Sequence, residues 1–185
     1  MAKSKMHVSP QGTLAFAWIK APDEEYGNKY KATLLLDKDG GENDAFVSKV
    51  NAVHDKARGK KTTPSPVKDG DTRDKEEFHG KWMVGFKSKF QPKLYDGKRN
   101  VIDPNGDECA SSGDSVRVAF TLFEYSTGSM AGVSLQLAAL QVIEKRANHG
   151  DSPFGEVDGG FEASGAVFGD SSSNDEDLGD DSIDF

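Results

Sequence analysis

Large apolar side chains alternate with small or polar ones in short segments before residue 145. Residues 13–19, Thr-Leu-Ala-Phe-Ala-Trp-Ile, are the clearest case, and a period of two is typical of a strand with one buried face. Further strands are expected at residues 30–36, 81–90, 100–102, 115–125 and 133–143. Five or six strands without βαβ alternation predict a mainly β fold, an antiparallel barrel or a sandwich.

One segment has the 3.6-residue period of an amphipathic helix instead. Apolar residues recur at that spacing from Phe46 to Ala57, which predicts a helix at about 44–58, between the second and third strands. His54 on this helix is expected at the surface or half-buried. Residues 59–80 contain prolines and many charges without apolar periodicity, so we expect a long mobile loop there.

The charges divide the chain into two parts. Residues 1–150 contain 23 Lys and Arg against 20 Asp and Glu, whereas residues 151–185 contain 11 acidic residues and no basic one. A segment rich in Gly, Ser and acidic residues cannot bury enough apolar surface to offset its ordering entropy. We therefore predict one folded domain at residues 1–148 and a disordered acidic tail at residues 149–185.

Several classes of protein are excluded by the same residues. No apolar run approaches the roughly 18 residues of a membrane span, and the N-terminal residues lack the apolar region of a secretory signal. The expectation is a soluble intracellular protein that contacts no membrane. Cys109 is the single cysteine, which excludes an intramolecular disulfide and a cysteine zinc site.

Catalytic and metal motifs are almost absent, so we expect neither an enzyme nor a cofactor. Residues 103–114 place oxygen ligands at the first, third and fifth positions of a calcium loop. Glu108 stands where that loop requires Gly, and Asp114 where it requires Glu, so a polar connecting loop is expected. No metal ligands are predicted.

Basic and aromatic residues form the stronger pattern. In segment 81–90 the alternation places Trp82, Val84, Phe86 and Phe90 toward the core and Lys81, Lys87 and Lys89 on the opposite face. Arg117 and Tyr125 share the outward face of segment 115–125. Cations for phosphates and rings for bases are what sequence-tolerant binding of single strands requires. The alternative is that these lysines only solvate outer strand faces.

The order and spacing of several short motifs resemble the replicative single-stranded DNA-binding proteins of T-seven-like bacteriophages. These motifs are Gly12-Thr13, Phe16-Ala17-Trp18-Ile19, Pro22-Asp23, Tyr30-Lys31, Ala57-Arg58-Gly59-Lys60-Lys61, Phe90-Gln91, Val133-Ser134-Leu135-Gln136-Leu137 and the closing Asp184-Phe185. The resemblance covers most of the body. It implies an OB-fold, an oligonucleotide-binding antiparallel barrel, with its helix between the second and third strands.

The resemblance also implies particular contacts. It places Met83, Gly85 and Lys87 on the DNA-facing side of their strand, where family members tend to have Lys, Lys and an aromatic residue. Together with the basic and aromatic pattern, the residues expected to bind DNA are Lys3, Phe16, Trp18, Lys31, Arg58, Lys81, Lys87, Lys89, Tyr95, Arg117 and Tyr125.

The tail is expected to compete with DNA for the basic groove, because tethering gives it a high effective concentration. The resemblance implies that the tail recruits the phage DNA polymerase and helicase-primase, with contacts at Asp180, Asp181, Asp184 and Phe185. It further implies roles in DNA replication, recombination, repair and annealing, a homodimer, and the cytoplasm of the infected bacterial host.

Two other classes remain open from the residues alone. A metal-dependent nuclease needs clustered carboxylates, for which the candidates are Asp69, Asp71, Asp103 and Asp107. An acidic-tailed adaptor would bind proteins and no DNA. An RNA chaperone is a variant of the main hypothesis, since stacking and phosphate contacts hardly distinguish RNA from DNA.

Overall fold

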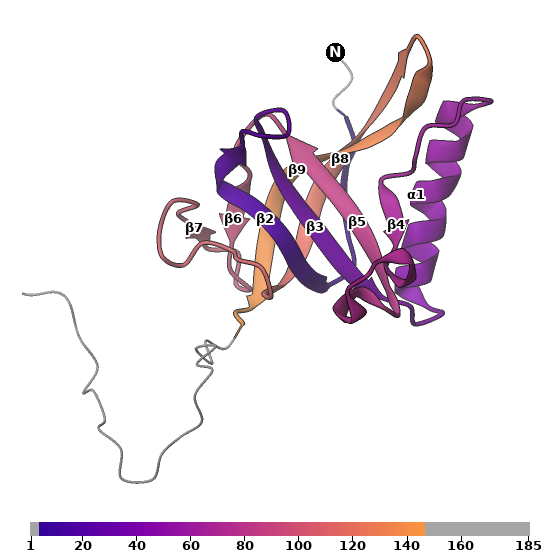
Figure 1. The fold of residues 1–185 in the computed structure, drawn as a ribbon. Helices are drawn as coiled ribbons and strands as arrows, with labels where there is room; N and C mark the ends of the chain where they lie inside the picture. The colour runs from indigo at the N-terminus through magenta and orange to yellow at the C-terminus, as the bar shows by residue number, and fades with distance from the viewer. Residues whose placement is uncertain (1–3, 147–185) are drawn as a thin grey trace, which may run out of the picture. The chain divides into compact units, whose positions relative to one another are not determined.

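The computed structural model describes residues 4–146 of the chain. Figure 1 shows a mainly β body with one α-helix, which confirms the predicted fold class. In chain order the elements are β1 (Met6–Val8), β2 (Gly12–Asp23), β3 (Lys29–Asp37), α1 (Glu42–Arg58), β4 (Val67–Asp69), the 3₁₀ turns η1 (Gly70–Thr72) and η2 (Glu76–Phe78), β5 (Lys81–Ser88), β6 (Lys93–Tyr95), β7 (Val101–Ile102), β8 (Ser115–Thr127) and β9 (Met130–Glu144). The sequence prediction omitted three short strands, β1, β4 and β6.

No helix in residues 4–146 is long and apolar enough to cross a membrane.

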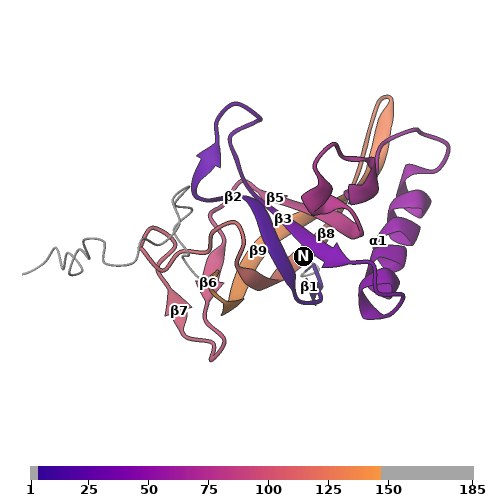
Figure 2. The same ribbon diagram turned by 60° about the horizontal axis from the view of Figure 1, so that its bottom comes forward.

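Five strands close into a ring in the order β8-β2-β3-β5-β9, because β8 pairs with both β2 and β9. All these pairs are antiparallel except β5 with β9. Short strands extend the sheet outward, β1 on β8, β6 on β9 and β7 on β6. Figures 1 and 2 show α1 along one side of the strands and β6 and β7 on the opposite side.

The inside of the ring is filled by one hydrophobic core. Its fully buried side chains alternate with outward ones along each strand, as the period of two requires. Each such side chain contributes about 1.5–3 kcal/mol on leaving water. Those with less than 2% exposure include Leu14, Leu34, Leu36, Val84, Phe86, Leu94, Val116, Val118, Leu135 and Leu140.

His54 corrects the sequence prediction, because it is only 1% exposed. Its Nδ1 accepts a hydrogen bond from the backbone N–H of Val133 (3.2 Å), so its Nε2 carries the proton and donates to the carbonyl oxygen of Thr63 (3.0 Å). Both ring nitrogens are thus satisfied, which makes burial of a polar ring tolerable. The imidazole joins α1 to β9 and to the segment after the helix.

Residues 59–80 also differ from the expected long loop. β4 pairs with β5, and two apolar side chains of the segment, Val67 and Phe78, are buried. The ammonium of Lys38 holds the segment through Asp69 (2.6 Å) and Asp71, and lies 4.6 Å from the ring centre of Trp82. Two buried residues so far apart give no periodic signal, so the sequence pattern did not reveal this order.

The segment at 103–114 connects β7 to β8 and contributes Cys109 and Ala110 to the core. The carboxylate of Asp114 is buried and accepts hydrogen bonds from Lys145 Nζ (2.9 Å) and from the N–H groups of Ser111 (2.9 Å) and Arg146 (2.8 Å). Burial alone would raise the pKa of Asp114, but these donors together outweigh it and lower the pKa. Within the described part of the chain, no three His, Cys, Asp or Glu side chains are grouped to hold a metal ion.

Candidate nucleic-acid interface

An irregularity in β2 turns Phe16 outward. Ala15 lies opposite Thr33 and Trp18 opposite Lys31, so β2 has one residue more than β3 between these pairs. This is a β-bulge, and it places Phe16 at φ 47°, a left-handed conformation that is rare for an aromatic residue. Phe16 is 51% exposed, and the centre of its ring lies 5.7 Å from the ring centre of Phe78.

A row of side chains crosses the outside of the ring next to this bulge. Trp18 lies opposite Lys31, Lys31 opposite Lys87, and Lys87 opposite Gln136 on β9. Residues directly opposite each other share one face of a sheet. An indole, two ammonium groups and an amide therefore line up across β2, β3, β5 and β9.

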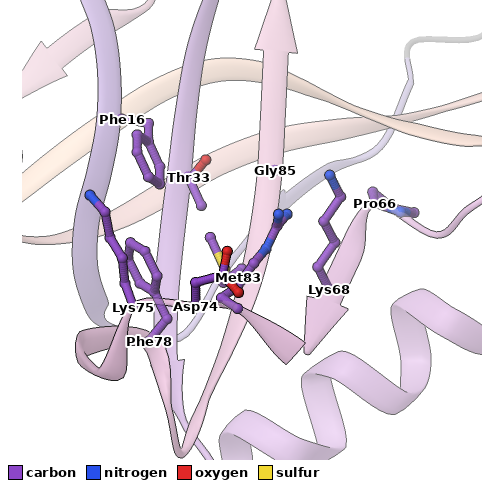
Figure 3. A pocket seen from close by; sticks show the side chains of 10 residues that line it. Phe16, Thr33, Pro66, Lys68, Asp74, Lys75, Phe78, Met83 and Gly85 are labelled. Carbon is purple, nitrogen blue, oxygen red and sulfur yellow. The ribbon is translucent and has the colours of Figure 1, made fainter. Parts of the chain in front are cut away.

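Gly85 leaves a depression beside this row. It lies opposite Thr33, and a Cβ atom added to Gly85 would meet only the carbonyl oxygen of Pro66, at 3.7 Å. Figure 3 shows Gly85 between Phe16 and Phe78 on one side and Lys68 on the other. Met83 lies on the same face of β5, packs against Phe78 and is only 6% exposed.

Three hollows of about 410, 360 and 530 Å³ join along β5 and the two residues after it, from Met83 to Phe90, and we call them together the groove. The first and second share Gly85 and Lys68, and the second and third share Lys87 and Tyr125. Their basic side chains are Lys29, Lys31, Lys68, Arg73, Lys75, Lys87 and Lys89, against a single acidic one, Asp74. Their aromatic side chains are Phe16, Phe78, Phe86, Phe90, Phe123 and Tyr125.

Lys87 lies where the second and third hollows of the groove meet, near two other lysines. Partial burial of its ammonium, and then the positive charges of Lys29 and Lys31, lower the pKa of Lys87 from its usual 10.5. Lys31 has a partner in Asp23 at 2.8 Å, whereas Lys87 has no ion pair within residues 4–146. A phosphate bound here would relieve the repulsion among these ammonium groups.

The structure brings together five of the residues that the sequence singled out. Phe16, Lys31, Lys87, Lys89 and Tyr125 line the groove. Trp18, 46% exposed, adjoins them through its pairing with Lys31.

The other predicted contacts lie elsewhere. Lys81 stands opposite Asp37 at the start of β5, and Arg58 pairs with Asp55 at the end of α1. Tyr95 and Arg117 line a separate hollow with Arg99. Lys3 and the tail residues Asp180, Asp181, Asp184 and Phe185 lie outside the described residues.

Several groove residues were missed or misassigned from the sequence. Lys68, Arg73 and Lys75 belong to the segment taken for a loop. Phe90, assigned to the core, is 80% exposed, because β5 ends at Ser88, whose hydroxyl accepts a hydrogen bond from the Phe90 N–H (3.0 Å). The same alternation that placed Tyr125 outward would have found Phe123, which is 52% exposed.

Comparison with known proteins places this geometry in a family. The model of a family described as Enterobacter phage Enc34, ssDNA-binding protein, matches residues 14–178. No curated protein matches the sequence.

Solved structures share the fold at low sequence identity. The single-stranded DNA-binding protein from bacteriophage Enc34 superposes with a TM-score of 0.63 and 19% identity, over 81% of this chain and 87% of that chain. The same protein in complex with ssDNA superposes with a TM-score of 0.63 and 21% identity, over 81% of this chain and 89% of that chain. The single-stranded DNA-binding protein gp2.5 of bacteriophage T7 superposes with a TM-score of 0.59 and 20% identity, over 84% of this chain and 100% of that chain.

These findings confirm the resemblance that the sequence motifs indicated. Because the relatives are binding proteins, they also agree with the prediction that the chain is not an enzyme. With a family model that spans residues 14–178, the chain belongs to the phage Enc34 single-stranded DNA-binding protein family.

Proposed function

We propose that the chain binds single-stranded DNA without sequence preference, through the groove, during phage DNA replication. The observation that supports this most is the groove itself, in which seven basic side chains and several exposed rings lie along one strand. Cations neutralise phosphates, and aromatic faces stack on any base, so this combination gives affinity without base readout.

The groove suggests how a strand would be held. From Met83 in β5 to Lys89, the residue after its end, the chain extends for about 20 Å at about 3.3 Å per residue, which is the length of roughly six stacked nucleotides. Lys31 and Lys87 would contact phosphates near its middle. Phe16 at one end and Tyr125 at the other would stack on bases.

The body is proposed to be an OB-type barrel. A closed ring of five strands, antiparallel apart from one parallel pair, is the arrangement expected of that fold. We further propose the division into a binding domain at residues 1–148 and an acidic tail at residues 149–185.

The tail is proposed to limit access to the groove. Its 11 acidic residues complement a groove with seven cations, and tethering keeps them close. By the family resemblance, Asp180, Asp181, Asp184 and Phe185 would also recruit the phage DNA polymerase and helicase-primase. Roles in recombination, repair and annealing, a homodimer and a location in the host cytoplasm rest on that resemblance alone.

Fluorescence anisotropy with labelled single-stranded and duplex DNA tests the proposal. The full chain should prefer single strands, and the full-length variant D180N/D181N/D184N should bind them more tightly. RNA of the same length, added as competitor, measures the preference for DNA. Absence of binding by both proteins would refute the proposal in favour of the protein adaptor, and magnesium-dependent loss of the strand would favour the nuclease.

A further inference from the structure

A second hollow, which we call the arginine hollow, lies on the outer face of the sheet formed by β1, β8, β9 and β6. It has a volume of about 280 Å³ and shares no lining residue with the groove. Val8, Ala119 and Ala139 stand opposite one another across its floor. The small alanine side chains leave the depression, and Tyr95 lies at its rim, in register with Gln141.

Two guanidinium groups border this apolar floor. Arg99 and Arg117 are both exposed, and neither forms an ion pair within residues 4–146. The acid nearest to Arg99 in sequence, Asp96, is occupied by its own turn, since its carboxylate accepts hydrogen bonds from the backbone N–H groups of Lys98 and Asn100. The acid nearest to Arg117, Asp114, is buried and paired with Lys145. Arg99 itself is held at φ 70° in that turn. The hollow therefore offers an apolar surface beside two uncompensated positive charges.

The arginine hollow continues the face that carries the groove. Along β8 the outward side chains run from Arg117 through Ala119 to Phe123 and Tyr125, and the last two line the groove. Ala119 and Phe123 are four residues apart, which is about 13 Å along a strand. Figure 1 shows β8 and β9 running together from the hairpin beside α1 toward β6. A strand of DNA that leaves the groove past Phe123 can follow this face.

We propose that the arginine hollow binds a further base and its flanking phosphates of the same DNA strand that occupies the groove. The proposal rests on the proposed function and extends its site. A base face would lie on the alanine floor beside the ring of Tyr95, and Arg99 and Arg117 would each pair with a phosphate, for which the planar guanidinium is well suited. Single-stranded DNA fits better than an acidic peptide, because the hollow lies on the groove's own face, one short interval along it.

Oligonucleotides of two lengths distinguish binding at the arginine hollow from binding in the groove. An oligothymidylate of about six nucleotides fills the groove, and one of about twelve also reaches the hollow, at about 3.4 Å per stacked nucleotide. The full-length double variant R99A/R117A should bind the six-mer like the unmodified chain. For the twelve-mer, the slope of log affinity against log salt should become shallower by about 1.4. Between about 0.1 and 1 M salt, the variant should therefore lose about 25-fold less affinity than the unmodified chain loses.

Two controls accompany this experiment. The variant K49A/K56A removes the same charge from the exposed side of α1 and should change neither oligonucleotide. Y95L should weaken the twelve-mer alone, because it removes a stacking surface and no charge. Unchanged six-mer binding shows that each variant is folded.

Other outcomes would overturn the proposal. Equal weakening of both oligonucleotides by R99A/R117A would mean a general charge effect, and no weakening would mean that DNA does not reach the hollow. Tighter twelve-mer binding would mean that the hollow holds an acidic segment instead. In all three cases the groove stands if K87A still weakens the six-mer, whereas failure of the unmodified chain to bind either oligonucleotide would refute the proposed function itself.

Discussion

Replacing Lys87 by methionine removes one charge from the middle of the groove and keeps an apolar stem of similar length. The lysine projects from β5 between Lys31 and Gln136 and has no ion pair within the described chain. If it neutralises one phosphate, the slope of log affinity against log salt becomes shallower by about 0.7 on a single strand. Between about 0.1 and 1 M salt, the variant should therefore lose about fivefold less affinity than the unmodified chain loses.

The same change should not destabilise the protein. Burial and the charges of Lys29 and Lys31 lower the pKa of Lys87, so the folded state binds its proton less tightly than the unfolded state. Charged Lys87 therefore opposes folding below its folded pKa, and stability rises as the pH increases through that value toward 10.5. K87M should keep or raise the midpoint of urea unfolding and lose this rise with pH.

Anisotropy titrations at four salt concentrations and urea melts measure the two effects together. K49M on the exposed side of α1 is the matched control, because it removes the same charge from a residue that does not line the groove. Weaker DNA binding with unchanged or greater stability is the signature expected of a ligand-binding lysine. An unchanged salt slope in K87M, or the same change in K49M, would refute the assignment of Lys87 to a phosphate.

Three further predictions concern the body of the protein. F16G should be more stable than F16A by about 1 kcal/mol in urea melts, the reverse of the usual order in a strand, because only glycine accepts the positive φ without strain. Both variants should bind single strands more weakly by about 1–3 kcal/mol per lost stacking contact, measured by anisotropy. H54A should lower the free energy of unfolding by about 3 kcal/mol, because it leaves a cavity and two unpaired backbone groups, and the thermal midpoint reports it. The lowered pKa of Asp114 means that its contribution is present above the unfolded value of 3.8 and is lost as the pH falls through the folded pKa, so D114N should be less stable at neutral pH and should show a smaller acid dependence.

The long strands and the helix could be predicted because each has a complete period. Alternation is clear at residues 30–34 and 115–122, and the observed β3 and β8 contain the predicted segments 30–36 and 115–125. The helix was found within two residues of its observed start, although its buried face includes His54, which hydropathy alone assigns to the surface. Short strands such as β4 contain too few residues to repeat a period, so their order depends on tertiary contacts that a local pattern does not include.

The groove was predictable only in part, for a related reason. Alternation identifies which face of a strand a residue occupies, and this placed Lys87 and Tyr125 correctly on an outer face. It does not identify which outer faces adjoin, and Tyr95 and Arg117 consequently fall in a different hollow. Nor does it foresee that residues 59–80 fold over β5 and bring Lys68 and its basic neighbours to the groove wall.

The bulge at Phe16 shows why such a site departs from local rules. A regular β2 would continue the alternation that predicts a strand, and it would not need a positive φ at an aromatic residue. Conformations of this kind cost about 1–3 kcal/mol and persist where the surrounding structure enforces them. Here the surrounding structure is the buried cluster of Ala15, Leu35, Phe78 and Met83, which fixes the chain at Ala15, directly before the bulge. The bulge thus lowers stability at Phe16, and it places the exposed ring of Phe16 beside Phe78 at the end of the groove, where a base can stack on it.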